Sequence, residues 1–217
     1  MKTRLLMMVM SSLLLSSCGL ASPPDSNDKE PIVANGNSQF TPAGIAGIKN
    51  AHKAVFDFTG RPLKMSELGL DQDSDGALVA AESDQPIAVS MTTPNGVVEM
   101  ETDTIRIRRG TDNAVDHIDF FVNRPDVPTA NEELRKAADE LGFALIRKAA
   151  PFGAASQESP RREKWYPGYG NLTGTVYSVE IYSDSDTGRT TFIYSVHLAD
   201  KFYTPEATEK IEATGKP

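Results

Sequence analysis

Apolar and polar residues alternate most regularly between residues 86 and 100. Two alternating runs flank a Pro-Asn-Gly sequence, with apolar residues at Ile87, Val89, Met91, Val98 and Met100. Asn-Gly pairs are typical of tight type I′ turns, because both central residues need a positive φ. We therefore expect a hairpin in which Pro94 pairs with Val97 and Met91 lies opposite Met100, so that one face is apolar.

The alternation continues beyond this hairpin. Ile105 and Ile107 extend the second strand, with Arg106 and Arg108 on the other face. A turn at 110–113 then precedes a further alternating run at Ile118, Phe120 and Val122. The pattern predicts an antiparallel meander of three strands. Glu99, Glu101 and Asp103 also alternate, which is typical of the solvated face of a strand.

A helical period follows the meander. Leu134, Ala137, Ala138 and Leu141 have the i, i+3, i+4, i+7 spacing of one buried helix face. Thr129, with Glu132 three residues later, resembles a capping box, and Gly142 suits the position after the last turn. We expect this to be the main helix, starting after Thr129 and ending before Gly142.

The remaining segments are shorter. Two alternating runs face each other across a turn at 184–188 and predict a C-terminal hairpin; their apolar members are Tyr177, Val179, Ile181, Phe192, Tyr194, Val196 and Leu198. Thr204 suits the cap of a short final helix. Residues 143–146 favour a short strand, and residues 149–174, rich in Pro and Gly, favour a loop. Residues 40–58 are ambiguous, although Ile45, Ile48 and Val55 can line a weak helix.

Together these elements predict an α+β fold: an antiparallel β-meander and a C-terminal β-hairpin, with one main helix packed on the sheet. The length of 217 residues is enough for one domain with its own core. The chain has 22 Lys plus Arg against 30 Asp plus Glu, a formal net charge of −8. Such a balance argues against a nucleic acid as partner, because phosphates require a basic face.

The first eighteen residues have the composition of a signal. Lys2 and Arg4 precede an apolar run, residues 5–15, that is shorter than the about 20 residues needed to cross a bilayer. The run ends in two serines followed by Cys18, the only cysteine. This segment resembles the lipobox signal of bacterial lipoproteins. The resemblance implies cleavage before Cys18, a diacylglycerol on its sulfur and an acyl chain such as palmitate on its amine. An ordinary secretory signal with a chance cysteine is the alternative.

Three parts are therefore expected: a signal peptide at 1–17, a lipidated flexible tether at 18–39 and a single α+β domain at 40–217. The tether is polar and rich in Pro, Asn and Ser, and its length corresponds to a reach of about 25 Å. In Gram-negative lipoproteins an Asp after the cysteine usually implies retention at the inner membrane. Gly19 stands there in this chain, which favours the outer membrane, with the domain facing the periplasm.

The sharpest local motif is acidic. Asp71, Asp73, Asp75 and Glu82 occupy positions 1, 3, 5 and 12 of a segment that has Gly76 at position 6. This resembles the twelve-residue loop of EF-hand calcium proteins. The resemblance makes calcium a candidate cofactor, with a further oxygen from the Ala77 carbonyl. The flanking sequence fits less well, because Pro86 interrupts the exiting helix and no second copy exists. An acidic surface loop is the alternative interpretation.

Two other groups are candidates for chemistry or contact. The histidines, His52, His117 and His197, belong to no G-x-S-x-G or H-E-x-x-H motif. The strand pattern places His197 beside Ser195 on a face expected to meet solvent. The segment with the only tryptophan contains residue types enriched in binding hot spots, and its candidate partner-binding residues are Arg162, Trp165, Tyr166 and Tyr169. Folding of Trp165 and a tyrosine back onto the core is the alternative.

These observations predict a lipid-anchored periplasmic binding lipoprotein without catalytic activity, of the kind that serves as an envelope accessory or as an inhibitor or immunity protein. The expected partners are the membrane, through the lipid anchor, and another protein. Two alternatives stay open. One is a calcium-stabilised structural envelope protein, and the other is an envelope hydrolase whose site the sequence does not identify.

Overall fold

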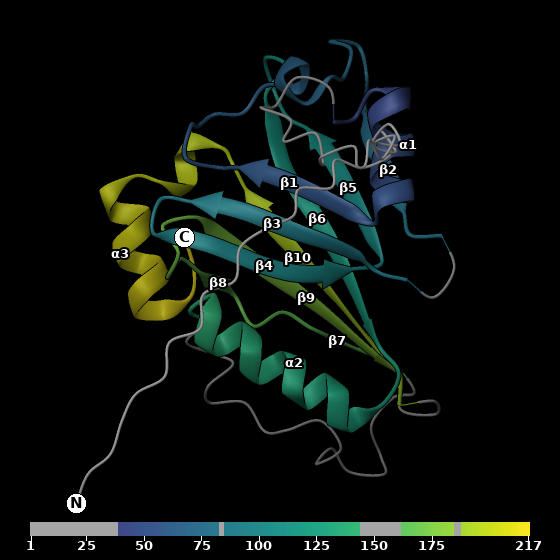
Figure 1. Cartoon of the computed structure of the whole chain (residues 1–217). Helices are drawn as coiled ribbons and strands as arrows, with labels where there is room; N and C mark the ends of the chain where they lie inside the picture. The colour runs from purple at the N-terminus through teal and green to yellow at the C-terminus, as the bar shows by residue number, and fades with distance from the viewer. Residues whose placement is uncertain (1–38, 83–84, 144–161, 185–187) are drawn as a thin grey trace, which may run out of the picture. The chain divides into compact units, whose positions relative to one another are not determined.

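The computed structural model describes residues 39–82, 85–143, 162–184 and 188–217 (Figure 1). All of them belong to one compact unit, Val33–Pro217. Cys18 with the signal, most of the expected tether and most of the expected strand at 143–146 lie outside the described residues. The elements, in chain order, are α1 (Pro42–Ala51), β1 (Lys53–Asp57), η1 (Met65–Leu68), β2 (Gly76–Ala80), β3 (Ile87–Thr93), β4 (Gly96–Thr102), β5 (Thr104–Arg109), β6 (Val115–Arg124), α2 (Val127–Glu140), β7 (Arg162–Trp165), β8 (Tyr169–Gly170), β9 (Val176–Asp184), β10 (Thr190–His197), η3 (Asp200–Phe202) and α3 (Pro205–Thr214).

The strands form two sheets. The larger sheet has the order β2-β5-β6-β10-β9-β7, with β8 also paired to β9, and its pairs are antiparallel. The smaller sheet has the order β1-β3-β4, in which β1 and β3 are parallel and β3 and β4 antiparallel. The fold is α+β, with an antiparallel meander and α2 as the main helix, as the sequence predicts.

The expected meander is divided between the two sheets. Strands β3 and β4 pair in the smaller sheet, whereas β5 pairs with β6 in the larger one. The chain changes sheet at Asp103, whose backbone N–H donates to the Phe121 carbonyl (2.8 Å). The Thr102 hydroxyl lies 2.9 Å from the carbonyl oxygens of Thr104 and Phe121. These bonds fix the corner at Thr102 and Asp103, where the chain passes from one sheet to the other. The alternating pattern continues through this point and therefore does not predict the corner.

The β3–β4 hairpin forms, but in a different register from the expected one. Thr93 pairs with Gly96 and Met91 with Val98, so the loop consists of Pro94 and Asn95. The expected register placed Pro94 in the closing pair, where a backbone N–H is needed and proline has none. Thr93 supplies that N–H, and its hydroxyl also donates to the Gly96 carbonyl (2.7 Å). A shift by two residues keeps the same side chains on the apolar face.

Helix α2 starts earlier than the sequence predicts. Its N-cap is Asp126, whose carboxylate accepts the Thr129 N–H (2.9 Å), so the expected capping box at Thr129 and Glu132 is wrong. Pro128 lies in the first turn, where a helix loses nothing by the missing N–H. The rest of the expectation is confirmed: the predicted apolar stripe is buried, and Gly142 has a φ of 80°.

Two C-terminal predictions are confirmed. Strands β9 and β10 pair with Ile181 opposite Phe192 and Val179 opposite Tyr194, and Thr204 caps α3 by accepting the Ala207 N–H (3.2 Å). The ambiguous segment resolves into α1 followed by β1. The expected loop at 149–174 is wrong where it is described, because β7 and β8 form there.

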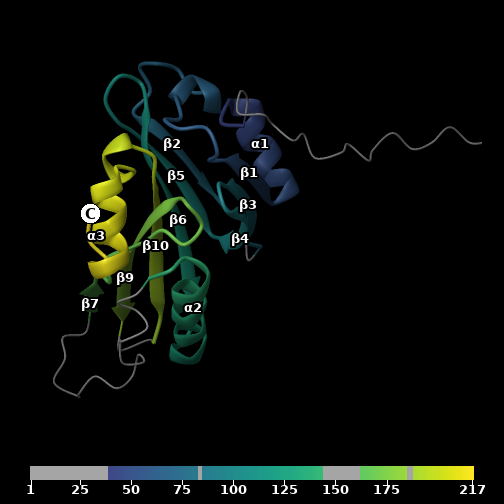
Figure 2. The ribbon, with the colours of Figure 1, turned by 90° about the vertical axis from the view of Figure 1, so that its left-hand side faces the viewer.

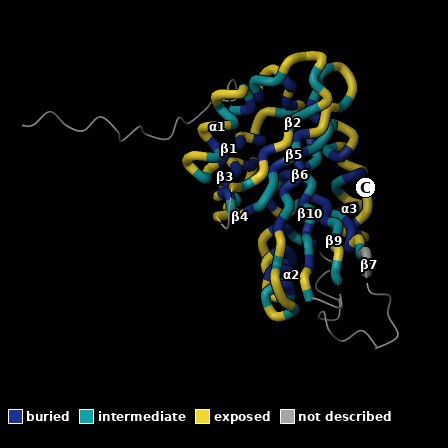
Figure 3. Tube along the Cα trace, turned by 90° about the vertical axis from the view of Figure 1, so that its right-hand side faces the viewer, coloured by how far each residue is buried: buried dark blue, intermediate teal, exposed yellow. Residues whose placement is uncertain are grey.

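The core lies against one face of the larger sheet. The smaller sheet and α2 cover that face side by side, while α3 lies on the opposite face (Figure 2). Inward side chains of the larger sheet pack against those of β3 and α2; they include Ile105, Ile118, Phe120, Val179, Phe192 and Tyr194. Along β10 the residues are alternately buried and half-buried (Figure 3), which shows that the second face is also partly covered.

The cap of α2 can be tested by two substitutions. We expect Asp126→Ala to lower the melting temperature more than Thr129→Ala does. Only the first removes the acceptor for the Thr129 N–H, whereas the second leaves that bond in place. Thermal melts followed by circular dichroism make the comparison. A larger loss for Thr129→Ala would mean that the helix starts at Thr129.

Candidate functional site

Polar side chains cross the larger sheet on the face away from the main core. Because they lie opposite one another on paired strands, they form two adjacent rows. We call them together the polar rows; the first contains Arg106, Asp119, Ser195 and Ser178, and the second Arg108, His117 and His197.

Asp119 is the centre of the first row. Its side chain is 1% exposed and accepts hydrogen bonds from the Arg106 guanidinium (2.7 Å) and the Ser195 hydroxyl (2.6 Å). Arg108 and His117 lie farther away, at 3.7 and 3.5 Å. A buried carboxylate with these partners is compensated in charge and in hydrogen bonds, which is what makes burial tolerable.

His197 and Ser178 form the second contact of note. The Ser178 hydroxyl lies 2.7 Å from Nε2 of His197. Burial, assisted by the nearby His117, lowers the pKa of His197 to about 4. The ring is therefore neutral at pH 7. A neutral histidine next to a serine has the residue types of a nucleophile and its base.

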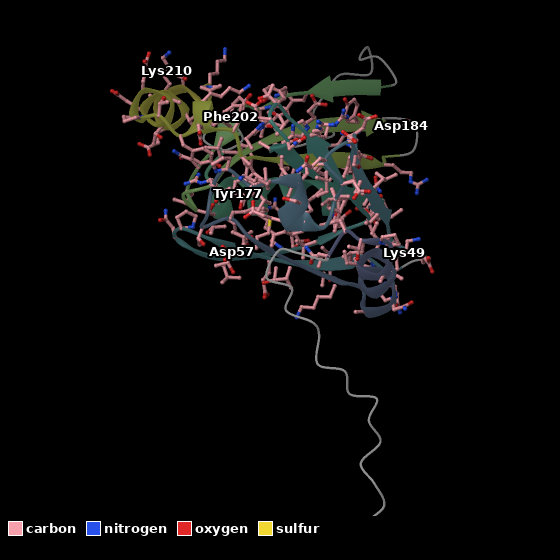
Figure 4. All side chains as sticks on the ribbon, turned by 90° about the horizontal axis from the view of Figure 1, so that it is seen from above. Lys49, Asp57, Tyr177, Asp184, Phe202 and Lys210 are labelled. Atoms are coloured by element: carbon pink, nitrogen blue, oxygen red, sulfur yellow. The ribbon has the colours of Figure 1, made fainter. Side chains whose placement is uncertain are left out.

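The segments η3 and β8, together with Tyr203, cover this pair. Phe202 of η3, labelled in Figure 4, lies with its ring centre 4.4 Å from that of His197, and Tyr169 of β8 lies 5.3 Å away. The Tyr203 hydroxyl donates to the His197 carbonyl and accepts the Val176 N–H (3.2 Å). The expectation that His197 meets solvent is therefore wrong, because η3 and β8 lie on that face of the sheet.

This arrangement does not form a hydrolytic triad in the described residues. Ser178 is 4% exposed, so a substrate has little access to its hydroxyl. The neighbouring carboxylates contact the other histidine: Asp116 lies 2.7 Å from Nδ1 of His117. A catalytic histidine needs an orienting group on its second nitrogen and an open path to the nucleophile. The geometry favours a structural role for Ser178 and His197.

Three adjoining hollows of the described surface lie elsewhere. Two of them lie between β4 and α2, the third extends over β3, and Glu99 and Lys136 line all three. We call them the β4–α2 groove. Near its floor the Tyr194 hydroxyl donates to Glu133 (2.8 Å), which also accepts from Arg124 (2.6 Å). Burial, followed by the charge of Glu133, raises the pKa of Tyr194 well above its usual value.

The acidic segment that resembles an EF-hand loop is open to solvent. Asp71, Asp73 and Asp75 are exposed, and Glu82 forms an ion pair with Lys49 (3.0 Å). From Gly76 onward, through Ala77, the chain is the extended strand β2. Residues 39–82 and the other described ranges contain no group of three or more His, Cys, Asp or Glu side chains placed to hold a metal. Calcium binding stays a prediction from the sequence.

The aromatic segment is divided between strands. Trp165 is half-buried at the end of β7 and packs against the main core, and Tyr169 packs against Phe202. Tyr166 is 43% exposed. Arg162 starts β7 opposite Asp184. The predicted contact surface is therefore not a single loop, although binding of a partner through these residues stays a prediction.

The sequence alone predicts only part of the groove and of the polar rows. The alternating acidic residues of β4 marked a solvated strand, but not a strand with an open edge. Ser178 and Asp119 carried no motif, and the contacts of Ser178 with His197 and of Asp119 with Ser195 depend on strand pairing across 19 and 76 residues. Comparison of the chain with protein-family models, curated proteins and solved structures finds no match. None of the described helices is long and apolar enough to cross a bilayer.

The burial of His197 predicts a dependence of stability on pH. The ordinary histidine pKa of 6.5 applies in the unfolded chain, whereas the folded value is about 4. Protonation therefore favours the unfolded state, and stability decreases as the pH falls from 6.5 to 4, by up to roughly 3 kcal/mol. Urea titrations at several pH values should show a smaller decrease for His197→Gln than for the wild type.

The control for this experiment is His52→Asn, which changes a histidine at the C-cap of α1, in a left-handed conformation that asparagine tolerates. It should keep the wild-type dependence on pH. Equal slopes for wild type and His197→Gln would contradict the assignment of the effect to His197.

Proposed function

We propose that the protein is a lipid-anchored periplasmic lipoprotein that binds another protein and catalyses no reaction itself. One observation carries the choice of binding over catalysis. The residues with catalytic potential, Ser178, His197 and His117, lie in the polar rows, whereas the β4–α2 groove is lined mainly by β3, β4 and α2 and contains no histidine. An enzyme needs its reactive groups and its cavity in the same place.

The groove has the features of a contact surface. It combines a half-buried apolar strip, Val98 and Met100, with charged side chains of β4 and α2. Val97 on the same strand is 62% exposed. Interfaces typically combine an apolar centre with a polar rim. Accessory subunits of envelope machines and inhibitors of toxins or hydrolases are the two roles that fit a small acidic binding lipoprotein, and both are inferred only from this general build.

The lipid anchor follows from the lipobox-like signal and Cys18. The anchor and the flexible tether would keep the domain at the periplasmic face of the outer membrane, within about 25 Å of the lipid. A partner would then be a protein of the outer membrane or of the adjoining periplasm.

The anchor is tested by Cys18→Ser. We expect the wild type to incorporate radiolabelled palmitate and to fractionate with outer membranes on a sucrose gradient. The variant should do neither, because the sulfur that carries the diacylglycerol is missing. Lys2→Gln is the matched control within the signal, and it should keep the label because one positive charge remains. Labelling of Cys18→Ser would contradict the assignment of the anchor.

Binding is tested by photo-crosslinking in cells. We expect a photoreactive residue at Val97 to give one discrete crosslinked protein, because the groove is the contact surface. The same residue at exposed Glu209 of α3 should give none. A crosslink at Tyr166 and not at Val97 would move the surface to the aromatic segment. Absence of a crosslink at both positions would contradict a protein-binding role for either surface.

A further inference from the structure

We propose that an extended segment of a partner protein, with basic and apolar side chains in alternation, adds as a fourth strand to the smaller sheet at the open edge of β4. This inference rests on the proposed binding function and specifies its mode. It follows from the backbone of β4, from the groove beside it and from the charges along it.

Strand β4 is the longest edge strand among the described residues. It has seven residues, compared with five each in β1 and β2 and four in β7. Short edge strands disfavour pairing with other chains, whereas long exposed ones favour it. The opposite edge of the smaller sheet is partly occupied, because the Val55 N–H of β1 donates to the Gln39 side chain (2.8 Å).

The direction of the backbone groups of β4 follows from the pairing of β3. Ala88 donates to the His52 carbonyl and Thr92 accepts the Phe58 N–H, so both turn their backbone groups away from β4. Their partners across the ladder are Glu101 and Val97. In an antiparallel pair, two opposed residues that do not hydrogen-bond to each other both direct their N–H and C=O groups away from the partner strand. Val97, Glu99 and Glu101 therefore direct their N–H and C=O groups to the open edge.

The groove provides space along this edge. Its lining follows β4 from Gly96 to Glu101, and α2 forms the opposite wall with Lys136 and Glu140. A strand placed there would bond to β4 on one side and face α2 on the other. Addition of a strand between an edge strand and a helix is a recurrent mode of peptide recognition, in which the backbone supplies affinity and alternate side chains supply specificity.

The charges select the occupant. The lining contains five acidic and three basic side chains. Two ion pairs, Arg124 with Glu133 and Lys136 with Glu140 (4.0 Å), account for two bases and two acids. The other charged side chains of the lining are the acidic Glu99, Glu101 and Asp139 and the basic Lys53. Glu99 and Glu101 are exposed on one face of β4, and Val98 and Met100 are half-buried on the other. Opposite charges directly across a ladder stabilise it, so Lys or Arg is expected at alternate positions of the partner strand.

The same charges argue against a second copy of this chain. In an antiparallel pair of two β4 edges centred on Glu99, the two Glu99 side chains would lie opposite each other, and in one centred on Met100, Glu99 would lie opposite Glu101. Like charges in these positions destabilise a ladder. The charges therefore favour a strand of a different protein over a second β4.

The probe is a blocked peptide of about nine residues that alternates Val with Lys and spans roughly 30 Å when extended. The full-length chain, purified in mild detergent, should bind it in fluorescence anisotropy and should not bind a peptide that alternates Val with Glu. Amide exchange measured by NMR should slow at Val97, Glu99 and Glu101 when the peptide binds. Binding without protection of these three amides would overturn the proposal.

Two variants separate the backbone from the side chain. Glu99→Pro removes one outward N–H and no bond within the sheet, so we expect about tenfold weaker binding and little change in melting temperature. Glu99→Gln keeps the N–H and should weaken binding less. Equal effects of the two variants would mean that only the charge matters, and would overturn strand addition.

A third test uses the wild-type protein and two modified versions of the Val-Lys peptide. One version carries a methyl group on the backbone nitrogen of every odd residue, and the other on that of every even residue. Only the set that faces β4 should abolish binding, because alternate residues of a strand bond to the same side. Equal binding of both peptides would overturn the proposal.

If the Val97 crosslink persists in cells and no peptide binds, the binding function stands and strand addition is wrong. If the crosslink is also absent, the proposed function fails with it.

Discussion

The corner at Thr102 and Asp103 is the constraint on which the arrangement of the domain depends. Asp103 accepts the Ala81 N–H through its carbonyl (2.8 Å) and the Asn123 N–H through its carboxylate (2.8 Å), and its own N–H bonds to Phe121. It therefore joins the end of β2 to β6 at the point where the chain leaves the smaller sheet. Without this change of sheet, β4 would continue into β5, and the open edge of β4 beside α2 would not exist.

A second consequence of the topology is that the larger sheet is covered on both faces. The apolar face is buried by β3, β4 and α2, as the alternation of side chains predicts. The polar face is covered at one end by η3 and β8, which bring Phe202 and Tyr169 over His197. A histidine in this place loses its hydration but keeps one hydrogen bond, to Ser178. Its low pKa is thus mainly a result of burial by β8, which precedes it in the chain, and by η3, which follows it.

Features set by neighbouring residues follow from the sequence, whereas features set by distant contacts do not. The apolar stripe of α2, the cap at Thr204 and the β9–β10 pairing could be predicted, because their determinants are adjacent or form one hairpin. The hairpin loop and the cap of α2 differ from the expectation, because Pro94 has no N–H for a closing pair and Asp126 accepts a free N–H in the first turn of the helix. The groove and the polar rows could not be predicted, because the contacts that form them depend on the division of strands between sheets.

An open strand edge is a liability as well as a binding surface. Lipid-anchored copies, as proposed for this protein, would be concentrated in the plane of a membrane, which favours pairing between identical edges. Glu99 and Glu101 oppose that pairing by repulsion, and the wall formed by α2 limits how a folded neighbour could approach. A flexible basic segment avoids both obstacles, because it is narrow and carries the opposite charge. The features that protect the edge from self-association are therefore the same ones that define its partner.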